Sequence, residues 1–151
     1  MKNAFTMIEL IFVIVIIGIL TAVAIPKLSA TRDDAKIATI KTNIISSANE
    51  VIAYVTSKGK IEDDISKMSQ ILKNMLNANS AILSADKKSI GFKFGNKNDC
   101  IVLLLRKNAI TNNTQLVINK PNTADTKCQM LQNKINANNY PITISGKLIV
   151  D

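Results

Sequence analysis

The apolar residues of this 151-residue chain are concentrated in one segment near its N-terminus. Between Phe5 and Ile25 only Thr6, Glu9 and Thr21 are clearly polar. At about 1.5 Å per residue this segment makes a helix of about 32 Å, which is close to the thickness of a bilayer core. The pattern therefore predicts a helix that enters a membrane, and it argues against a purely cytosolic globule.

From Lys27 onward the pattern becomes amphipathic. Apolar residues recur at intervals of three and four, which is the spacing of one helix face. The helix is predicted to end near Ser57–Lys60, where Gly59 can follow a helix C-terminus in the left-handed conformation. We expect one helix from Phe5 to near Val55, apolar all round in its first half and one-sided in its second. The apolar positions of the second half are Ile37, Ile40, Ile44, Ala48, Val51 and Val55.

The remaining sequence predicts one short helix and several strands. The helical pattern opens at Ile61–Asp64, whose acids suit the N-terminus of a helix dipole, and it ends at Asn77–Ser80. Beyond it, short apolar runs alternate with turns rich in Asn, Lys and Gly, and an antiparallel sheet of about four strands on the amphipathic helix would bury both surfaces. The expected strands are Ile90–Phe94, a central Cys100–Leu105, Leu116–Ile118, Ile142–Ile144 and Lys147–Val150.

Three interpretations fit the N-terminal apolar segment. A secretory signal peptide would be cut after Ala22–Ala24, an A-x-A-like site, whereas a plain membrane anchor would stay uncut. Both leave Glu9 unexplained, because an acidic residue at membrane depth costs several kcal/mol. The third interpretation gives Glu9 a function and places a processing point between Ala4 and Phe5.

The third interpretation rests on a motif, Ala4 to Leu10 followed by Gly18 and Pro26. This motif resembles the N-terminal signature of type IV pilins and type II secretion pseudopilins. In that family a prepilin peptidase cuts a short, positively charged leader before a Phe, and the new terminal amine is methylated. The resemblance implies cleavage between Ala4 and Phe5 and methylation of Phe5. Ala4 departs from the Gly that usually precedes the cut, but it is small, so cleavage is still expected.

Counted from Phe5, the residues Glu9, Gly18 and Pro26 fall at the fifth, fourteenth and twenty-second mature positions, where the family usually carries these residue types. Cleavage would create a positive amine near Glu9, and in an assembling bundle the Glu9 carboxylate could pair with the amine of a neighbouring subunit. A charge buried in lipid is tolerated when it is paired. We therefore expect Glu9 to direct assembly; a snorkelling or protonated Glu without that role is the alternative.

Gly18 and Pro26 both weaken the predicted helix. Gly costs about 1 kcal/mol relative to Ala in a helix interior, and Pro lacks the N–H that the helix needs. The segment between them is predicted to bend or melt when subunits pack in a filament. An ordinary proline kink near the membrane surface explains the same residues.

The resemblance implies an α+β, pilin-like fold, with a long N-terminal helical spine packed on a small antiparallel sheet. We expect a leader at residues 1–4, a transmembrane and assembly helix at 5–26, the amphipathic half of the spine at 27–57 and a head domain at 58–151. Because Lys2 favours the cytoplasmic side, the chain would cross the inner membrane once, with its head in the periplasm.

The two cysteines, Cys100 and Cys128, would then lie in an oxidising compartment, where a disulfide is predicted and free buried thiols are the alternative. The bond would close a loop of 29 residues and contribute roughly 3–4 kcal/mol on a chain-entropy estimate. Many type IV pilins carry such a loop, while major type II pseudopilins generally use calcium instead. Few acids follow Asp64, so we expect no metal site and no cofactor.

Composition bears on the class of protein. The chain contains no His, which excludes the common zinc sites and His-dependent catalysis, so we predict no enzyme activity. Residues 65–150 hold twelve Lys or Arg against three Asp, a net charge of +9. Such a head could capture nucleic acid through phosphate contacts, but a solvated basic surface is the favoured interpretation.

We therefore predict a structural filament subunit, a pilin or pseudopilin assembled from the inner membrane for protein secretion. Its expected partners are copies of itself, minor pilins, the prepilin peptidase, an assembly platform with its ATPase, the membrane, and secreted proteins or DNA. The alternatives are a competence pseudopilin for DNA uptake, an adhesive pilus subunit, and a membrane-anchored periplasmic binding domain that never polymerises. Glu9 distinguishes the last of these, because a lone anchor has no need of it.

Overall fold

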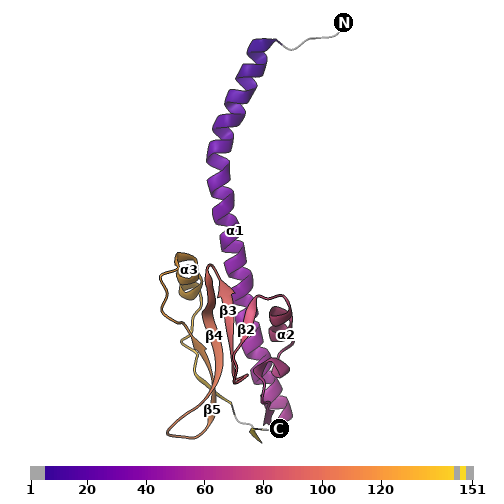
Figure 1. Ribbon diagram of the computed structural model, residues 1–151, viewed down its shortest axis with the longest axis vertical. Helices are drawn as coiled ribbons and strands as arrows, with labels where there is room; N and C mark the ends of the chain where they lie inside the picture. The colour runs from indigo at the N-terminus through magenta and orange to yellow at the C-terminus, as the bar shows by residue number, and fades with distance from the viewer. Residues whose placement is uncertain (1–5, 145–146, 149–151) are drawn as a thin grey trace. The chain divides into compact units, whose positions relative to one another are not determined.

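The computed structural model describes residues 6–144 and 147–148. The chain divides into two compact units, residues 1–38 and 39–151. Helix α1 (Met7–Lys58) is continuous through both units. Figure 1 shows the second unit as a head in which an antiparallel sheet and a short helix lie beside the C-terminal part of α1. This α+β architecture confirms the predicted fold class.

The predicted end of the long helix is confirmed. The N–H of Gly59 donates to the carbonyl oxygen of Val55 at 2.8 Å, and Gly59 has a φ of +66°. A left-handed residue directly after the last helical turn stops the helix, because its N–H turns back onto a free carbonyl group. The chain then reverses into the head.

The main sheet has five antiparallel strands in the order β2-β3-β4-β5-β6. The predicted central strand is confirmed, because β4 lies in the middle of this order. The prediction of about four strands omitted β2, whose three residues give too short a pattern to recognise. The strands are β2 (Ala81–Leu83), β3 (Ser89–Phe94), β4 (Lys97–Lys107), β5 (Thr114–Asn119) and β6 (Ile142–Ile144).

A separate two-stranded sheet joins the beginning and the end of the head. Strand β1 (Lys60–Ile61) pairs in parallel with β7 (Lys147–Leu148). The last predicted strand is therefore present, although not in the antiparallel sheet, and its residues 149 and 150 lie outside the described residues.

The prediction of a helix that begins at Ile61 is wrong for its first turn. Ile61 belongs to β1, and the region divides into a 3-10 helix η1 (Ile65–Met68) and helix α2 (Gln70–Asn77). One of the acids before η1 caps it: the side chain of Asp64 accepts the N–H of Ser66 at 2.8 Å. Ser69 then separates the two helices in an extended conformation and caps α2 through the N–H of Leu72. Local side-chain capping, which competes with a continuous helix, explains the difference.

The core of the head lies between the second half of α1 and the sheet. Within the head, the stripe predicted on α1 is buried at Ile44, Ala48, Val51 and Val55, and Phe92 and Phe94 of β3 are buried as well. Glu50 of α1 also binds the short helices, because its carboxylate accepts the Ser69 hydroxyl at 2.6 Å and the Ile71 N–H at 3.1 Å. The pKa of Glu50 is lowered, and the main cause is the hydrogen bond from the Ser69 hydroxyl. The largest fully buried side chains include Phe92, Ile44, Ile61, Ile65, Leu72, Ile90, Ile101, Leu103 and Leu116.

Helix α3 (Thr126–Lys134) was not predicted. Its composition is polar, and the only inward residues that it places in the core are Cys128 and Leu131. Two contacts hold it to the sheet: Cys128 is bonded to Cys100 of β4, and Gln132 donates to the carbonyl oxygen of Cys100 at 2.9 Å. Asp125 caps the helix itself, because its carboxylate accepts the N–H of Cys128 at 2.7 Å. The disulfide predicted from the sequence is confirmed.

Gly95→Ala is expected to destabilise the head by more than about 2 kcal/mol. Gly95 turns the chain from β3 into β4 with a φ of +62°, and an added Cβ would lie 2.3 Å from Oδ1 of Asp125. That carboxylate cannot easily move, because it also accepts the N–H of Asn96 at 3.0 Å. Urea unfolding of the full chain in detergent measures the loss. The matched control is Gly18→Ala, whose new Cβ meets nothing within 4 Å; equal stability of the two variants would contradict the expectation.

Candidate assembly and processing site

The predicted processing residues, Ala4 and Phe5, lie outside the described residues. The structure begins at Thr6, and α1 starts at Met7. Cleavage before Phe5 and methylation of its amine therefore remain predictions. What the structure describes is the first turn of the helix that follows them.

That first turn contains a reciprocal pair of side chains, Thr6 and Glu9. The Glu9 carboxylate accepts the Thr6 N–H at 2.8 Å and the Thr6 hydroxyl at 2.6 Å. In return, the Glu9 N–H donates to the Thr6 hydroxyl oxygen at 3.3 Å. This is a capping box, in which a Thr at the helix N-cap and a Glu three residues later satisfy backbone donors that the helix itself leaves free.

The capping box gives the Glu9 carboxylate two hydrogen-bond donors within its own chain. Both donors are neutral, so neither supplies a positive charge to pair with an ionised carboxylate at this end of the helix. A cationic group that reached this carboxylate would form a stronger, charge-assisted hydrogen bond. A cationic group would therefore bind the Glu9 carboxylate more strongly than the two Thr6 donors do.

Thr6 is a site residue that the sequence interpretation missed. It was treated only as a polar interruption of the apolar run. The signal that identifies it is the spacing Thr6-x-x-Glu9 directly before an apolar helix, which is the sequence form of the capping box.

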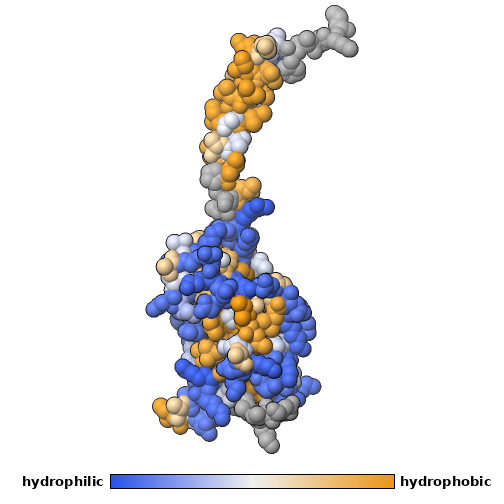
Figure 2. All heavy atoms as spheres, in the orientation of Figure 1, coloured by the Kyte–Doolittle hydropathy of each residue, from blue (hydrophilic) through white to orange (hydrophobic). Residues whose placement is uncertain are grey.

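The helix after this cap is apolar on every side. Its segment Met7–Ile25 is a candidate membrane span of 19 residues with a mean hydropathy of 3.0, and none of it is buried. Figure 2 shows this stretch covered almost wholly by apolar atoms. Exposed side chains such as Met7 and Ile8, at 81% and 75%, need a lipid or protein environment. The span fits a membrane-anchored chain.

Gly18 and Pro26 both lie within the continuous helix α1. The surroundings of Gly18 would accommodate a larger side chain, since an added Cβ would have no neighbour within 4 Å. In the described structure the segment between Gly18 and Pro26 is therefore helical. Bending or melting of the segment between them in a filament stays a prediction.

The described part of the head contains no metal-binding cluster. Within residues 6–144 and 147–148, no group of three His, Cys, Asp or Glu side chains is placed to hold a metal ion. The carboxylates described above have structural roles. Asp64 caps η1, Asp125 caps α3 and also accepts the N–H of Asn96, and Glu50 joins α1 to Ser69 and Ile71.

Comparison with known proteins finds the family described as the prokaryotic N-terminal methylation motif, which matches residues 1–25. This motif is the signature of type IV pilins and pseudopilins, so the resemblance stated from the sequence is confirmed. The match includes Ala4, Phe5, Glu9 and Gly18 and ends one residue before Pro26. No curated protein matches the chain significantly, and neither does any solved structure.

Proposed function

We propose that this chain is a structural subunit of a type IV pilus-like or type II secretion filament. The observation that carries the proposal is the methylation motif on a fully exposed apolar helix whose first turn holds a lone carboxylate, Glu9. The presence of both a long apolar N-terminal helix and a small sheet-containing head supports the same function, because such a subunit needs both. The polypeptide would act by packing, not by catalysis.

Assembly would proceed from the membrane. The prepilin peptidase would remove residues 1–4 at the cytoplasmic face, which leaves a charged, methylated amine on Phe5. The Glu9 carboxylate of an incoming subunit would exchange its Thr6 donors for the amine of a neighbour, because an ion pair is favoured over neutral donors in a medium of low dielectric constant. The apolar segments would then pack together and leave the lipid, driven by the platform and its ATPase.

We assign the filament to protein secretion, with the head in the periplasm and a single membrane span. The disulfide supports the location of the head, since such bonds persist in oxidising compartments. Minor pilins and exoproteins are the expected partners. Filaments that bind and retract DNA would instead identify a competence pseudopilin, and a protein that never polymerises would identify an anchored binding domain.

Processing is expected to shorten the chain by its first four residues and to add one methyl group. Lys2 keeps the leader on the cytoplasmic side, where the family's peptidase acts. Intact-mass analysis of protein extracted from membranes measures both changes, and cells without the peptidase provide the control. A mature chain that begins at Ile25 would contradict the expectation and would identify a secretory signal peptide.

A further inference from the structure

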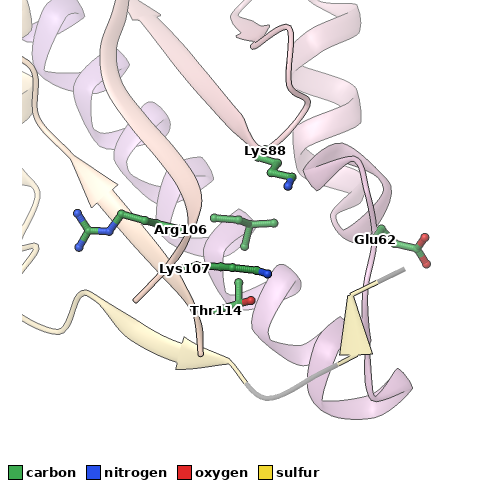
Figure 3. A pocket seen from close by; sticks show the side chains of 6 residues that line it. Glu62, Lys88, Arg106, Lys107 and Thr114 are labelled. Atoms are coloured by element: carbon green, nitrogen blue, oxygen red, sulfur yellow. The ribbon is translucent and has the colours of Figure 1, made fainter. Parts of the chain in front are cut away.

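A small pocket of about 80 Å³ lies in the head beside the C-terminal end of β4. Figure 3 shows the ammonium groups of Lys88 and Lys107 directed into the same space, with Thr114 beside Lys107, while Arg106 extends away from it. The residues that line the pocket are Glu62, Lys88, Leu105, Arg106, Lys107 and Thr114.

The backbone fixes the two lysines relative to each other. Lys107 and Thr114 are directly opposite each other in the β4–β5 ladder. The carbonyl oxygen of Lys88 accepts the N–H of Leu105 at 2.9 Å, and the carbonyl oxygen of Lys87 accepts the N–H of Ile65 at 2.9 Å. The turn that carries Lys88 is thus held against β4 and against η1. The pocket is preorganised by the sheet, which reduces the entropy that a ligand must overcome.

The positive charge of the pocket is not balanced within the described part of the chain. Glu62 is the only acid that lines it, and its carboxylate already accepts the Tyr54 hydroxyl and forms a 2.9 Å ion pair with Lys60. These two contacts lower the pKa of Glu62. No carboxylate among residues 6–144 and 147–148 lies within ion-pair distance of the Lys88 or Lys107 ammonium group.

Asp86 is the other acid near this turn, and it is also occupied. Its carboxylate accepts the Ser84 hydroxyl and the backbone N–H of Lys88 at 3.1 Å. Those contacts hold the turn in shape. The Asp86 carboxylate attracts the Lys88 charge, but the two groups are not within ion-pair distance. Two like charges that face one space favour an anion between them.

The chemistry of the lining favours a phosphate group over a carboxylate. A planar carboxylate is best matched by the fork of an Arg side chain, whereas Lys binds phosphate as a point charge. The one Arg at this pocket extends away from it, and the two side chains that enter are lysines. A volume of about 80 Å³ holds several water molecules. It therefore admits the anionic group alone and leaves the rest of any larger ligand outside.

We propose that this pocket binds a single phosphate group. Lys88 and Lys107 provide the positive charge, and the Thr114 hydroxyl donates a hydrogen bond to one phosphate oxygen. The phosphate belongs either to a small soluble ion or to the backbone of a nucleic acid, since both offer the same group. This site is independent of the assembly role of the N-terminal helix, so the two can succeed or fail separately.

The test is a titration of the full chain in detergent micelles with inorganic phosphate, followed by amide NMR. Sodium chloride at equal ionic strength corrects for screening. We expect saturable shifts at residues 88, 107 and 114. Lys88→Gln and Lys107→Gln should each weaken binding by about tenfold. Lys97→Gln, at the opposite end of β4 and equally exposed, is the matched control and should change nothing.

Two results would overturn the proposal. One is a set of shifts that chloride reproduces at the same ionic strength, and the other is undiminished phosphate binding in the Lys88→Gln/Lys107→Gln double variant. Unchanged amide patterns in β4 and β5 verify that the variants are folded. A DNA duplex titrated in the same way distinguishes the sources: tighter binding that needs both lysines identifies a nucleic-acid backbone, and a response to inorganic phosphate alone identifies a small ion.

Discussion

Cells that carry Glu9→Ala as their only copy are expected to insert and process the protein normally but to form no filaments. Insertion should be unharmed, because removal of a carboxylate from an apolar helix makes the segment more compatible with lipid by several kcal/mol. Assembly should fail, because the variant has no anion to pair with a neighbour's amine and thus no contact to set the register between subunits. Shearing and crosslinking of surface and periplasmic filaments measure the loss.

Two further variants separate the intersubunit pair from the local capping box. Glu9→Gln keeps a hydrogen-bonding side chain without the charge, so it should give fewer filaments than the unchanged chain but more than Glu9→Ala. Thr6→Val removes the hydroxyl that holds the Glu9 carboxylate at 2.6 Å and leaves the charge in place. It should still assemble, because the Glu9 carboxylate remains free to reach an amine.

The outcomes of this experiment are easily told apart. Normal filaments from Glu9→Ala would contradict an assembly role for the carboxylate and favour the plain-anchor interpretation. Equal loss in Thr6→Val and Glu9→Ala would show that the local helix cap, not the pair between subunits, is what assembly requires. Intact-mass analysis of each variant confirms that it was processed.

Much of the fold could be predicted from the sequence where the pattern was long. Helix α1 is recognisable because a long apolar run is followed by an amphipathic stripe that ends at a glycine suited to a left-handed turn. The run Cys100–Leu105 could be identified as the central strand because it is continuously apolar. The second half of α1 and the central strand are buried, and burial leaves a direct record in the spacing of apolar residues.

The elements that were missed are defined by single polar contacts instead. Ser69 and Asp64 divide one apparent helix into two by capping. Helix α3 has only two buried residues, and a disulfide with a few hydrogen bonds holds it in place. The contacts that hold α3 to the sheet depend on partners far away in the sequence, so a sequence pattern cannot show them until the fold has brought the partners together. The caps of Asp64 and Ser69 are local, with partners two and three residues away, but the spacing of apolar residues does not record them.

The candidate functional residues also differ in whether the sequence alone could identify them. The motif that includes Glu9 could be found from the sequence, because it depends on fixed local spacing. The partner that Glu9 has in this structure, Thr6, is equally local and could have been found by the capping-box pattern. The lysine pocket could not, since it requires the register between β4 and β5 and the turn before β3.

Removal of the disulfide is expected to lower the stability of the head by roughly 3–4 kcal/mol. The Cys100→Ala/Cys128→Ala double variant leaves no free thiol and puts no polar group into the core, where both sulfur atoms are buried. For a head of this size the melting temperature should fall by more than about 10 °C. Thermal and urea unfolding of the full chain in detergent measure the change.

Helix α3 should show the loss first, because the disulfide is its only covalent link to the sheet. Without that link the helix keeps one buried leucine, Leu131, and the hydrogen bonds of Gln132 and Asp125. Its amides should therefore exchange with solvent much faster in the double variant, while those of β3 and β4 remain protected until global unfolding. Reduction of the unchanged chain by dithiothreitol should reproduce both effects. If the double variant melted at the same temperature as the bonded chain, with α3 equally protected, the packing of Leu131 and the two hydrogen bonds would suffice, and the disulfide would contribute nothing to the stability of the head.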